Sequence, residues 1–350
     1  MDFVDETRGK YVKLEDIGLT EAELFIFHKI INRISDRELY YMKLDRGLSG
    51  ESKIIVKPSS LFPLLVKIGD SIQIKKEYDG YQLLHLRIPA FNVPHLIDTE
   101  FESDKSALVY RYITRGLVKD PVSRLDVYIS EDLKDIIVPV LIELFDVILK
   151  KCHWLDGHFK MKQVCLPMLE DPQTGADPIV WNELFSYYEW FKNQAKKYKS
   201  PHGIVHGDLH PKNILIARNN LPIIIDYSMA NTESCVYIDY AKLEVHLQFQ
   251  VSSVVSDGFW HVSERMYSNG PLILPRSNKV LATCIHAIRS TLWKICLSKK
   301  VGLLNDEIDF GYRSYLLYYL IRFWSKTGIS NTARDQALKE IRSLVKGFCA

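Results

Sequence analysis

The chain has 350 residues, of which 47% are hydrophobic, and its formal net charge is only +2. This length and apolar content allow a large core and exceed one typical domain, so we expect two lobes. The near balance of charge, without a block of basic residues, argues against nucleic acid as a partner.

The cysteines and the N-terminus indicate the compartment. Six cysteines are scattered without C-x-x-C spacing, so we expect small buried side chains in a reducing environment and neither a zinc site nor a disulfide framework. The chain begins Met-Asp-Phe-Val-Asp-Glu, which lacks the basic and apolar regions of a signal peptide, and no apolar run reaches transmembrane length. We therefore expect a cytoplasmic protein without membrane contact.

Residues 1–36 predict an accessory helix. Thr20 and Glu23 have the spacing of a capping box, and an apolar series follows: Leu24, Phe25, Phe27, Ile30 and Ile31. Such an apolar face packs either on the lobe that follows or on a protein partner, and both interpretations stay open.

The next segment has the pattern of strands. Apolar and β-branched runs predict strands at 39–44, 53–57, 61–68 and 107–113, and a proline-punctuated connection at 86–98. Between the first two strands, Gly47 and Gly50 allow backbone N–H groups to approach phosphate oxygens, and Ser49 is a further donor. By itself, a Gly-x-x-Gly between strands is typical of a simple turn.

Lys67 lies in the third predicted strand, where a buried ammonium needs a partner. The segment that starts at Asp70 has capping residues and predicts a helix that carries Glu77, which we expect to be that partner. Lys57 is the competing lysine, but Pro58 beside it indicates the end of a strand and an exposed side chain.

The rest of the chain is mainly helical in pattern. Apolar spacing predicts helices at 132–151, 181–199, 279–298, 310–326 and 331–345. The last three carry aromatic stripes, which are more typical of a core than of a substrate cage.

Residues 202–226 read as a polar loop that feeds a hairpin. Two apolar runs flank Asn219 and Asn220, which suit a two-residue turn. A turn at that position places Asn213 directly opposite Asp226, with Cβ atoms about 4.5–5.5 Å apart. Two oxygen-bearing side chains at the mouth of an apolar hairpin suit a hard cation such as Mg²⁺, which completes its shell with water and phosphate. Asp208 is offset from this pair, as a base or orienting group would be.

The segment His206-Gly-Asp208-Leu-His210-Pro-Lys-Asn213, followed after the hairpin by Ile225-Asp226-Tyr227, resembles the catalytic loop and metal-binding Asp of a known family. This is the aminoglycoside phosphotransferase and choline kinase branch of the protein-kinase-like fold. The resemblance implies an α+β fold of two lobes: a small β-rich N-lobe at 37–115, after the accessory segment, and a larger, mostly helical C-lobe at 116–350. It also implies ATP and Mg²⁺ as cofactors.

The resemblance assigns roles to the motif residues. Asp208 accepts or orients the acceptor hydroxyl, and Asn213 and Asp226 hold Mg²⁺ on the nucleotide. Lys67, paired with Glu77, contacts the α and β phosphates of ATP. The loop of Gly47, Ser49 and Gly50 gains weight as a phosphate-binding loop only because this site is indicated independently.

Supporting positions follow from the same resemblance. The fourth strand leads to the hinge that pairs with adenine, so Tyr110 and Tyr112 are expected in the base pocket, although an ordinary buried strand fits equally. His206 braces the catalytic loop. Asp239 holds that loop by hydrogen bonds, and a role as N-cap of a helix at 240–251 is compatible with this.

Departures from the protein kinases favour the small-molecule branch. Tyr227-Ser228 stands where a protein kinase has Phe-Gly, no Ala-Pro-Glu follows, and His210 stands where a lysine is usual. An alternative treats His206, Asp208 and His210 as metal ligands on one face of an extended segment. That reading leaves the other motif residues unexplained.

We therefore expect an ATP- and Mg²⁺-dependent kinase that phosphorylates a hydroxyl of a small molecule such as an aminoglycoside, choline or a sugar. The alternative is an ATP-binding regulatory or scaffold module of a bacterial defence or signalling assembly with little turnover. The long polar segment 153–177 is of the kind that helps to shape the acceptor pocket in this family. Acidic residues of the large lobe suit a cationic acceptor, but such residues on loops are usually just solvated: Asp156, Glu170, Asp171, Asp177, Glu233 and Asp257.

Overall fold

A computed structural model describes residues 14–34, 39–44, 50–58, 62–113, 123–125, 139–141, 143–144, 160–170, 177–217, 220–251, 280–297 and 301–349. The chain forms two compact units. The first unit comprises Met1–Arg124 and Asn213–Ala230, and the second comprises Leu125–Lys212 and Asn231–Ala350. The predicted lobe boundary near Gly116 and most of the predicted helix at 132–151 lie outside the described residues.

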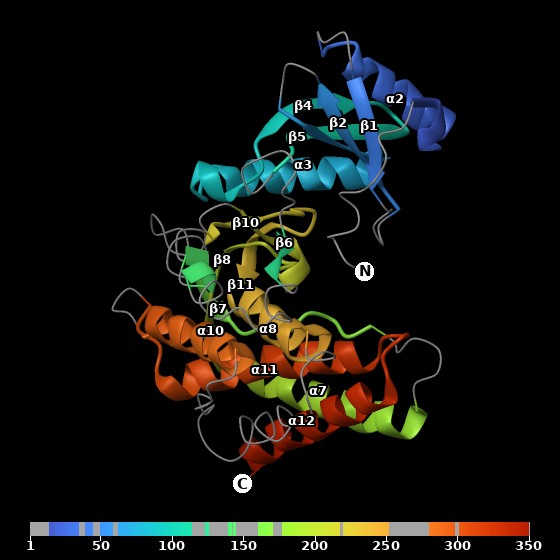
Figure 1. Ribbon diagram of the computed structural model, residues 1–350. Helices are drawn as coiled ribbons and strands as arrows, with labels where there is room; N and C mark the ends of the chain where they lie inside the picture. The colour runs from blue at the N-terminus through green and yellow to red at the C-terminus, as the bar shows by residue number, and fades with distance from the viewer. Residues whose placement is uncertain are drawn as a thin grey trace. The chain divides into compact units, whose positions relative to one another are not determined.

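A five-stranded antiparallel sheet forms the centre of the first unit, in the order β1-β2-β3-β5-β4 (Figure 1). Its strands are β1 (Leu39–Leu44), β2 (Ser52–Pro58), β3 (Leu64–Asp70), β4 (Leu96–Phe101) and β5 (Lys105–Arg111). Strand β4 is a correction, because the sequence predicted a connection at 86–98 and no further strand before 107, whereas β4 begins at Leu96. The prolines of that segment precede the strand, and β4 pairs with the outer edge of β5.

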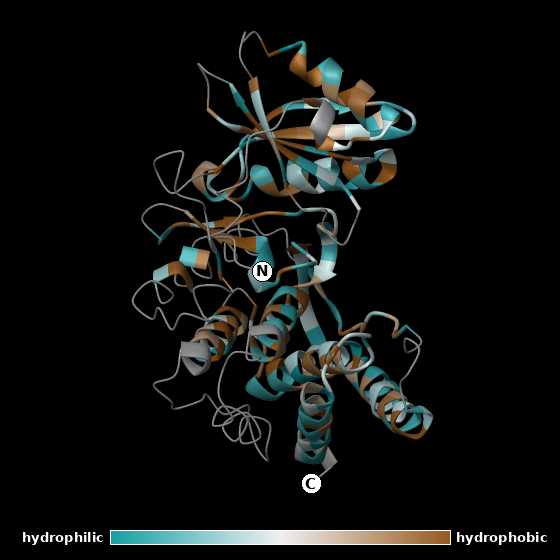
Figure 2. Cartoon of the chain, turned by 45° about the vertical axis from the view of Figure 1, so that its right-hand side comes forward, coloured by the Kyte–Doolittle hydropathy of each residue, from teal (hydrophilic) through white to brown (hydrophobic). Residues whose placement is uncertain are grey.

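Helices α2 (Glu21–Ile31) and α3 (Ser71–His85) cover opposite faces of this sheet (Figure 1). Successive side chains of a strand point to opposite faces, and because both faces are covered, β3 and β5 are buried at nearly every residue. Val66 and Val109 belong to the core under α2, whereas Lys67 of β3 meets α3 on the other face. Figure 2 shows that hydrophobic residues concentrate in the strands of the sheet.

The predicted capping box at the start of α2 is present. The Glu23 N–H donates to Thr20 Oγ1 at 3.3 Å, and the Thr20 N–H donates to Glu23 Oε2 at 2.9 Å. Ile26, Phe27 and Ile30 pack in the core of the sheet. This part of the apolar face therefore packs within its own unit, whereas Phe25 of the same predicted series is 57% exposed, and contact of the helix with a protein partner stays a prediction.

A smaller sheet in the first unit has the order β10-β9-β6. Its strands are β6 (Ser123–Arg124), β9 (Ile214–Ile216) and β10 (Pro222–Ile224). Pro222 pairs with Ile216, so the predicted hairpin register is wrong by one residue. The Ala217 N–H donates to the Leu221 carbonyl at 2.8 Å, and Asn220 has a φ of 59°. The loop therefore has three residues and not two, with Asn220 in the left-handed conformation that such loops need.

The second unit contains a three-stranded sheet in the order β11-β8-β7, which the sequence did not predict. Its strands are β7 (Lys160–Gln163), β8 (Lys199–Val205) and β11 (Asn231–Cys235). Helix α7 (Pro178–Ala195) begins at the N-cap Asp177 and ends before the predicted residue 199, because the chain turns there into β8. Strand β8 leads directly into the motif at 206–213.

The remaining described helices are α8 (Tyr237–His246), which continues into a π-helical turn at Leu247–Val251, α10 (Val280–Cys296), α11 (Asn305–Trp324) and α12 (Asn331–Cys349). Short 3₁₀ turns lie at Leu14–Ile17, Ala90–Asn92 and Pro211–Asn213. Helix α11 is buried over nearly its whole length, so its aromatic stripe is largely core. Cys165 is exposed, contrary to the expectation of buried cysteines.

A buried ion pair fixes helix α8 against its neighbours. Arg289 of α10 donates through Nε to Glu244 Oε2 of α8 at 3.0 Å, and the Tyr312 hydroxyl of α11 donates to the same oxygen at 2.7 Å. Removal of either charge would leave the other buried and uncompensated, which is strongly unfavourable. The position of α8 matters because it carries two residues of the candidate site. No helix of the described chain is long and apolar enough to cross a membrane.

Candidate functional site

Lys67 is buried in β3, and its ammonium contacts the Glu77 carboxylate of α3, as the sequence predicted. A second carboxylate, Glu51, lies 3.4 Å from Lys67 Nζ. The Tyr110 hydroxyl donates to the other oxygen of Glu77 at 3.2 Å. Glu51 and Tyr110 therefore help to hold the ion pair of Lys67 and Glu77 in place. Glu51 was not predicted as part of this cluster.

The charges around Lys67 keep it protonated. Burial alone lowers the pKa of a lysine, but the negative charges of Glu77, Asp226 and Glu51 more than compensate, and the pKa of Lys67 is raised. Burial raises the pKa of Glu77, against the opposing charge of Lys67. One ammonium thus faces three acidic groups. This surplus of negative charge suits a further cation.

A close approach joins α3 to the segment after Asp226. A Cβ atom on Gly80 would lie 1.9 Å from the Tyr227 carbonyl oxygen, so only glycine fits there. The rings of Tyr81 and Tyr227 meet edge to face, with centroids 5.7 Å apart. These contacts pack the segment that follows Asp226 against the helix that carries Glu77.

The predicted pair of Asn213 and Asp226 is not directly opposed across the hairpin. The Ile225 N–H donates to the Asn213 carbonyl at 3.0 Å, so Asn213 faces Ile225, and Asp226 lies one residue farther along. Asp226 has a φ of 65°, which ends the regular strand and turns its side chain out of the simple alternation. The Ser228 hydroxyl donates to Asp226 Oδ1 at 3.0 Å.

The donor chemistry of this segment fits Mg²⁺. An amide and a carboxylate supply two hard oxygen ligands, and Mg²⁺ usually takes few protein ligands and keeps water and phosphate. Among the described residues, no group of three or more His, Cys, Asp or Glu side chains is arranged to hold a metal. The alternative of a metal site built from His206, Asp208 and His210 therefore has no support in the described chain.

The other nucleotide predictions concern the glycine loop and the tyrosines. Gly47 and Ser49 lie outside the described residues, and Gly50 is exposed with a φ of 78°. Tyr110 lies inside β5 with its hydroxyl on Glu77, and the Tyr112 N–H donates to the Pro63 carbonyl at 2.8 Å. Contact of Tyr110 and Tyr112 with adenine stays a prediction.

In the second unit, Asp239 of α8 holds the backbone of the motif loop. Its carboxylate is fully buried and accepts from the His206 N–H at 2.9 Å and from the Gly207 N–H at 2.8 Å. The helix begins before Asp239, with Val236 at the N-cap and no side-chain cap, so the proposed capping role is wrong. His206 is buried, and its Nδ1 accepts from the Asp208 N–H at 3.3 Å.

Lys242 contacts Asp208 and was not predicted as a site residue. Its ammonium meets Oδ1 of Asp208, and His210 Nε2 lies 3.7 Å from the other carboxylate oxygen. Lys242 follows Asp239 by three residues on α8, so one face of the helix bears both side chains. That spacing is the signal by which the sequence could have revealed Lys242.

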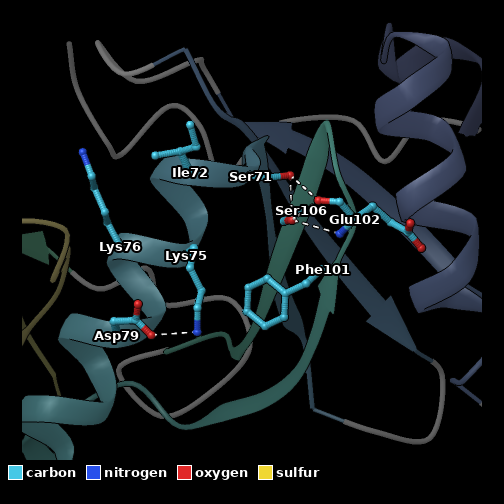
Figure 3. A pocket seen from close by; sticks show the side chains of 8 residues that line it. All are labelled: Ser71, Ile72, Lys75, Lys76, Asp79, Phe101, Glu102 and Ser106. Carbon is cyan, nitrogen blue, oxygen red and sulfur yellow. Dashed lines mark hydrogen bonds and ion pairs between the residues drawn. The ribbon is translucent and has the colours of Figure 1, made fainter.

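Each unit of the described chain contains a pocket, and of these two only the pocket in the second unit is lined by a residue that contacts the motif loop. The pocket in Figure 3 is in the first unit, between the outer face of α3 and strands β4 and β5, and none of the predicted site residues line it. The exposed Lys75 and Asp79 form an ion pair at 2.8 Å there. A recess in the second unit is lined by Lys242 and by five further residues, described below.

Comparisons with known proteins agree with this fold. The chain is similar to the crystal structure of aminoglycoside phosphotransferase APH(4)-Ia, with a TM-score of 0.53 and 13% identity over 95% of this chain and 100% of that one. A thermostable mutant of that enzyme, in a ternary complex with AMP-PNP and hygromycin B, has a TM-score of 0.51 and 12% identity over the same shares of the two chains. Choline kinase LicA from Streptococcus pneumoniae has a TM-score of 0.49 and 13% identity, over 93% of this chain and 100% of that one.

Comparisons of sequence match a smaller part of the chain than the comparisons of structure do. The model of a family described as ternary complex associated domain 9 matches residues 158–259, which include the motif loop and helix α8. No curated protein matches the sequence. The fold predicted from the motif is thus confirmed by the structural comparison: the chain has the two-lobed, kinase-like α+β fold of the aminoglycoside phosphotransferases.

Proposed function

We propose that the protein is an ATP- and Mg²⁺-dependent phosphotransferase that moves the γ-phosphoryl group to a hydroxyl of a small molecule. The observation that carries the proposal is the buried ion pair of Lys67 and Glu77 on the face of the sheet that α3 covers. A strand lysine held by a helix glutamate is what kinase-like folds use to anchor nucleotide phosphates. A role in packing alone would not need a buried charge.

Lys67 binds the phosphates of ATP in this proposal, and Glu77, Glu51 and the Tyr110 hydroxyl keep its ammonium in position. Asn213 and Asp226 would hold Mg²⁺. When bound, that ion supplies charge neutralisation for the phosphate oxygens as the transferring group loosens. The adenine lies beside the backbone at Tyr112, and Gly47, Ser49 and Gly50 cover the phosphates.

Asp208 orients the acceptor hydroxyl and takes its proton. The hydroxyl oxygen forms a bond to the γ phosphorus, the bond from that phosphorus to the β–γ bridging oxygen breaks, and ADP leaves. Lys242 contacts one oxygen of Asp208 and so sets its orientation. Asp239 and His206 hold the loop backbone on either side of Gly207. The chain thus contributes positioning and charge, without covalent catalysis.

The test uses Asp208→Asn and labelled ATP with a panel of small alcohols. We expect turnover to fall by about 10³-fold or more, because the amide cannot accept the proton. Mg·ATP affinity stays within about 2-fold, because Lys67 and Asp226 are untouched. Comparable turnover in the variant would remove Asp208 from this role.

A second candidate is a nucleotide-binding module of a multi-protein assembly, with little or no turnover. The observation that favours it is the match of residues 158–259 to a family described as a ternary complex associated domain. Thermal melting with Mg·ATP, followed by the labelled-ATP assay, separates the two. Binding without hydrolysis or transfer supports the module, transfer to an alcohol supports the enzyme, and no binding contradicts both.

A further inference from the structure

A recess in the second unit gathers basic side chains beside Asp208. Its lining comes from α8, from α11 and from the turn that follows α11: Lys242, His246, Tyr319, Arg322, Phe323 and Lys326. Four of these six side chains can carry positive charge. Tyr319 and Phe323 are themselves buried and form apolar walls.

The acidic groups of the described chain that lie near the recess already have other partners. Asp208 is engaged by Lys242, whose Nζ also lies 5.8 Å from the centroid of the Tyr319 ring. Arg322 reaches Glu170 at 3.5 Å, but the Glu170 side chain is 77% exposed, and such a pair is weak in water. Asp239, whose charge also reaches Tyr319, accepts from two backbone N–H groups of the motif loop. Among the described residues, each acidic group near the recess is therefore already engaged, and none forms an ion pair with Lys326.

Among the lining residues, Lys326 gives the clearest indication of the kind of ligand that the recess binds. It is partly buried, and no carboxylate of the described chain forms an ion pair with it. Burial and then the positive charges of Lys242 and Arg322 lower its pKa, against the smaller opposing effect of Asp208. Lys242 and Arg322 line the same recess and their positive charges disfavour the Lys326 ammonium, so packing alone gives no reason for a cation at this position. A bound anion accounts for it.

We propose that this recess binds an oxyanion, either a phosphate or a carboxylate, that the acceptor alcohol carries. The proposal rests on the proposed function and names its substrate class. Arg322 offers a planar fork of N–H donors, and Lys326 and Lys242 offer compact charges, which together suit such a group. It replaces the cationic acceptor that the acidic loop residues had suggested.

The position of Lys242 sets the shape of the acceptor. The same ammonium contacts Asp208 and lines the recess. An alcohol whose hydroxyl meets Asp208 therefore has its oxyanion only a short linker away. Small hydroxy acids and phosphorylated polyols have this arrangement, whereas amino alcohols place a positive charge where the recess already has several.

Equilibrium dialysis of radiolabelled inorganic phosphate against the full chain tests the recess without any need for turnover. We expect one saturable site that weakens about 10-fold or more in Lys326→Met and in Arg322→Gln. Lys294→Met, an equal change at an exposed lysine of α10, keeps the affinity of the wild type. Lys326→Met folds, because the change removes a repelled charge, and thermal melting checks this.

The outcomes separate the recess from the nucleotide site. No saturable phosphate binding, or equal binding in Lys326→Met, overturns the proposal. Displacement of the bound phosphate by saturating Mg·ADP also overturns it, because the phosphate would then occupy the nucleotide site. If the wild type binds phosphate through Lys326 but never binds Mg·ATP, the proposed kinase function fails while the recess stands.

Labelled ATP with matched alcohols tests the substrate class. Each pair shares a carbon skeleton and differs only in a phosphate or a carboxylate, so the two arms also tell these anions apart. We expect at least about 10-fold preference for an anionic member, and we expect Lys326→Met to abolish it while Lys294→Met keeps it. Equal transfer within every pair, or preference for amino alcohols, overturns the proposal.

Discussion

Each unit contains a buried or partly buried lysine, and the charges around the two lysines have opposite signs. In the first unit, Lys67 is buried against Glu77, and Asp226 is near enough to help raise its pKa despite burial. In the second unit, Lys326 lines the same recess as Lys242, whose positive charge adds to the effect of burial in lowering the pKa of Lys326. The same side-chain type is therefore stabilised in one unit and repelled in the other.

This difference indicates the ligand of each unit. A lysine among several carboxylates leaves surplus negative charge, which suits a metal ion that itself carries phosphate. A lysine among cations leaves surplus positive charge, which suits an oxyanion. The contrast can be tested by removing one charge at a time and measuring stability, because the two sites predict opposite signs.

Lys67→Met gives the largest expected effect on stability. The change leaves Glu51 and Glu77 buried without their ammonium, so we expect the free energy of unfolding to fall by about 3–5 kcal/mol in urea titrations. Lys76→Met, at an exposed position of α3, is the matched control and changes the free energy of unfolding by no more than about 0.5 kcal/mol. Similar losses in both variants would contradict the buried pair.

Asp239→Asn tests the brace of the motif loop. The amide NH₂ faces a backbone N–H of His206 or Gly207 in place of an acceptor, so we expect a loss of about 2–3 kcal/mol in unfolding free energy. Glu233→Gln, at a carboxylate that is 61% exposed, serves as control and stays within about 0.5 kcal/mol. The idea fails if Asp239→Asn is as stable as this control.

Gly80→Ala tests how α3 approaches the segment of Asp226. The added methyl group meets the Tyr227 carbonyl, so α3 must shift, and we expect a cost of about 1–2 kcal/mol together with weaker Mg·ATP binding. Calorimetric titration with Mg·ATP measures the second effect. Gln73→Ala, on the exposed side of the same helix, is expected to change neither quantity. Unaltered nucleotide affinity in Gly80→Ala would show that this contact does not position the site.

Lys326→Met has the smallest expected effect and the opposite sign. Removal of a repelled cation stabilises the fold by up to about 1 kcal/mol at neutral pH, since partial exposure screens the repulsion. The folded-state pKa lies below the unfolded value of 10.5, so the penalty is present below the folded pKa and disappears as pH rises through 10.5. The difference in unfolding free energy between the variant and the wild type therefore shrinks as pH rises. The charged and titratable groups near Lys326 include Lys242, Arg322, His246 and Asp208. A pH series of urea titrations detects this, and destabilisation at neutral pH would contradict it.

Local patterns predicted much of this molecule. The capping box at Thr20 and Glu23, strands β1 to β3 and the pairing of Lys67 with Glu77 follow from residues close together in the chain. The spacing from Asp208 to Asn213 led to the fold that the structural comparison supports. Short-range spacing carries such information because helix and strand periods act over a few residues.

The hydrophobic pattern of the sequence did not predict the short strands or the register of the hairpin. Strands β4, β7, β8 and β11 are stabilised by neighbours in their sheets, which a single run of residues does not reveal. The register at Asn213 depended on whether the loop held two or three residues, and both choices suit consecutive asparagines. One residue of loop length then moved every pair.

By itself, the sequence determined which chemistry is present: a lysine and a glutamate on adjacent elements, and a loop with Asp208, Asn213 and Asp226. Only the tertiary structure decided the surroundings of those groups. Glu51 joins Lys67 and Lys242 meets Asp208 because distant segments fold together. Charge balance and burial depend on neighbours in space, so the cationic recess at Lys326 became visible only once α8 and the end of α11 were in contact.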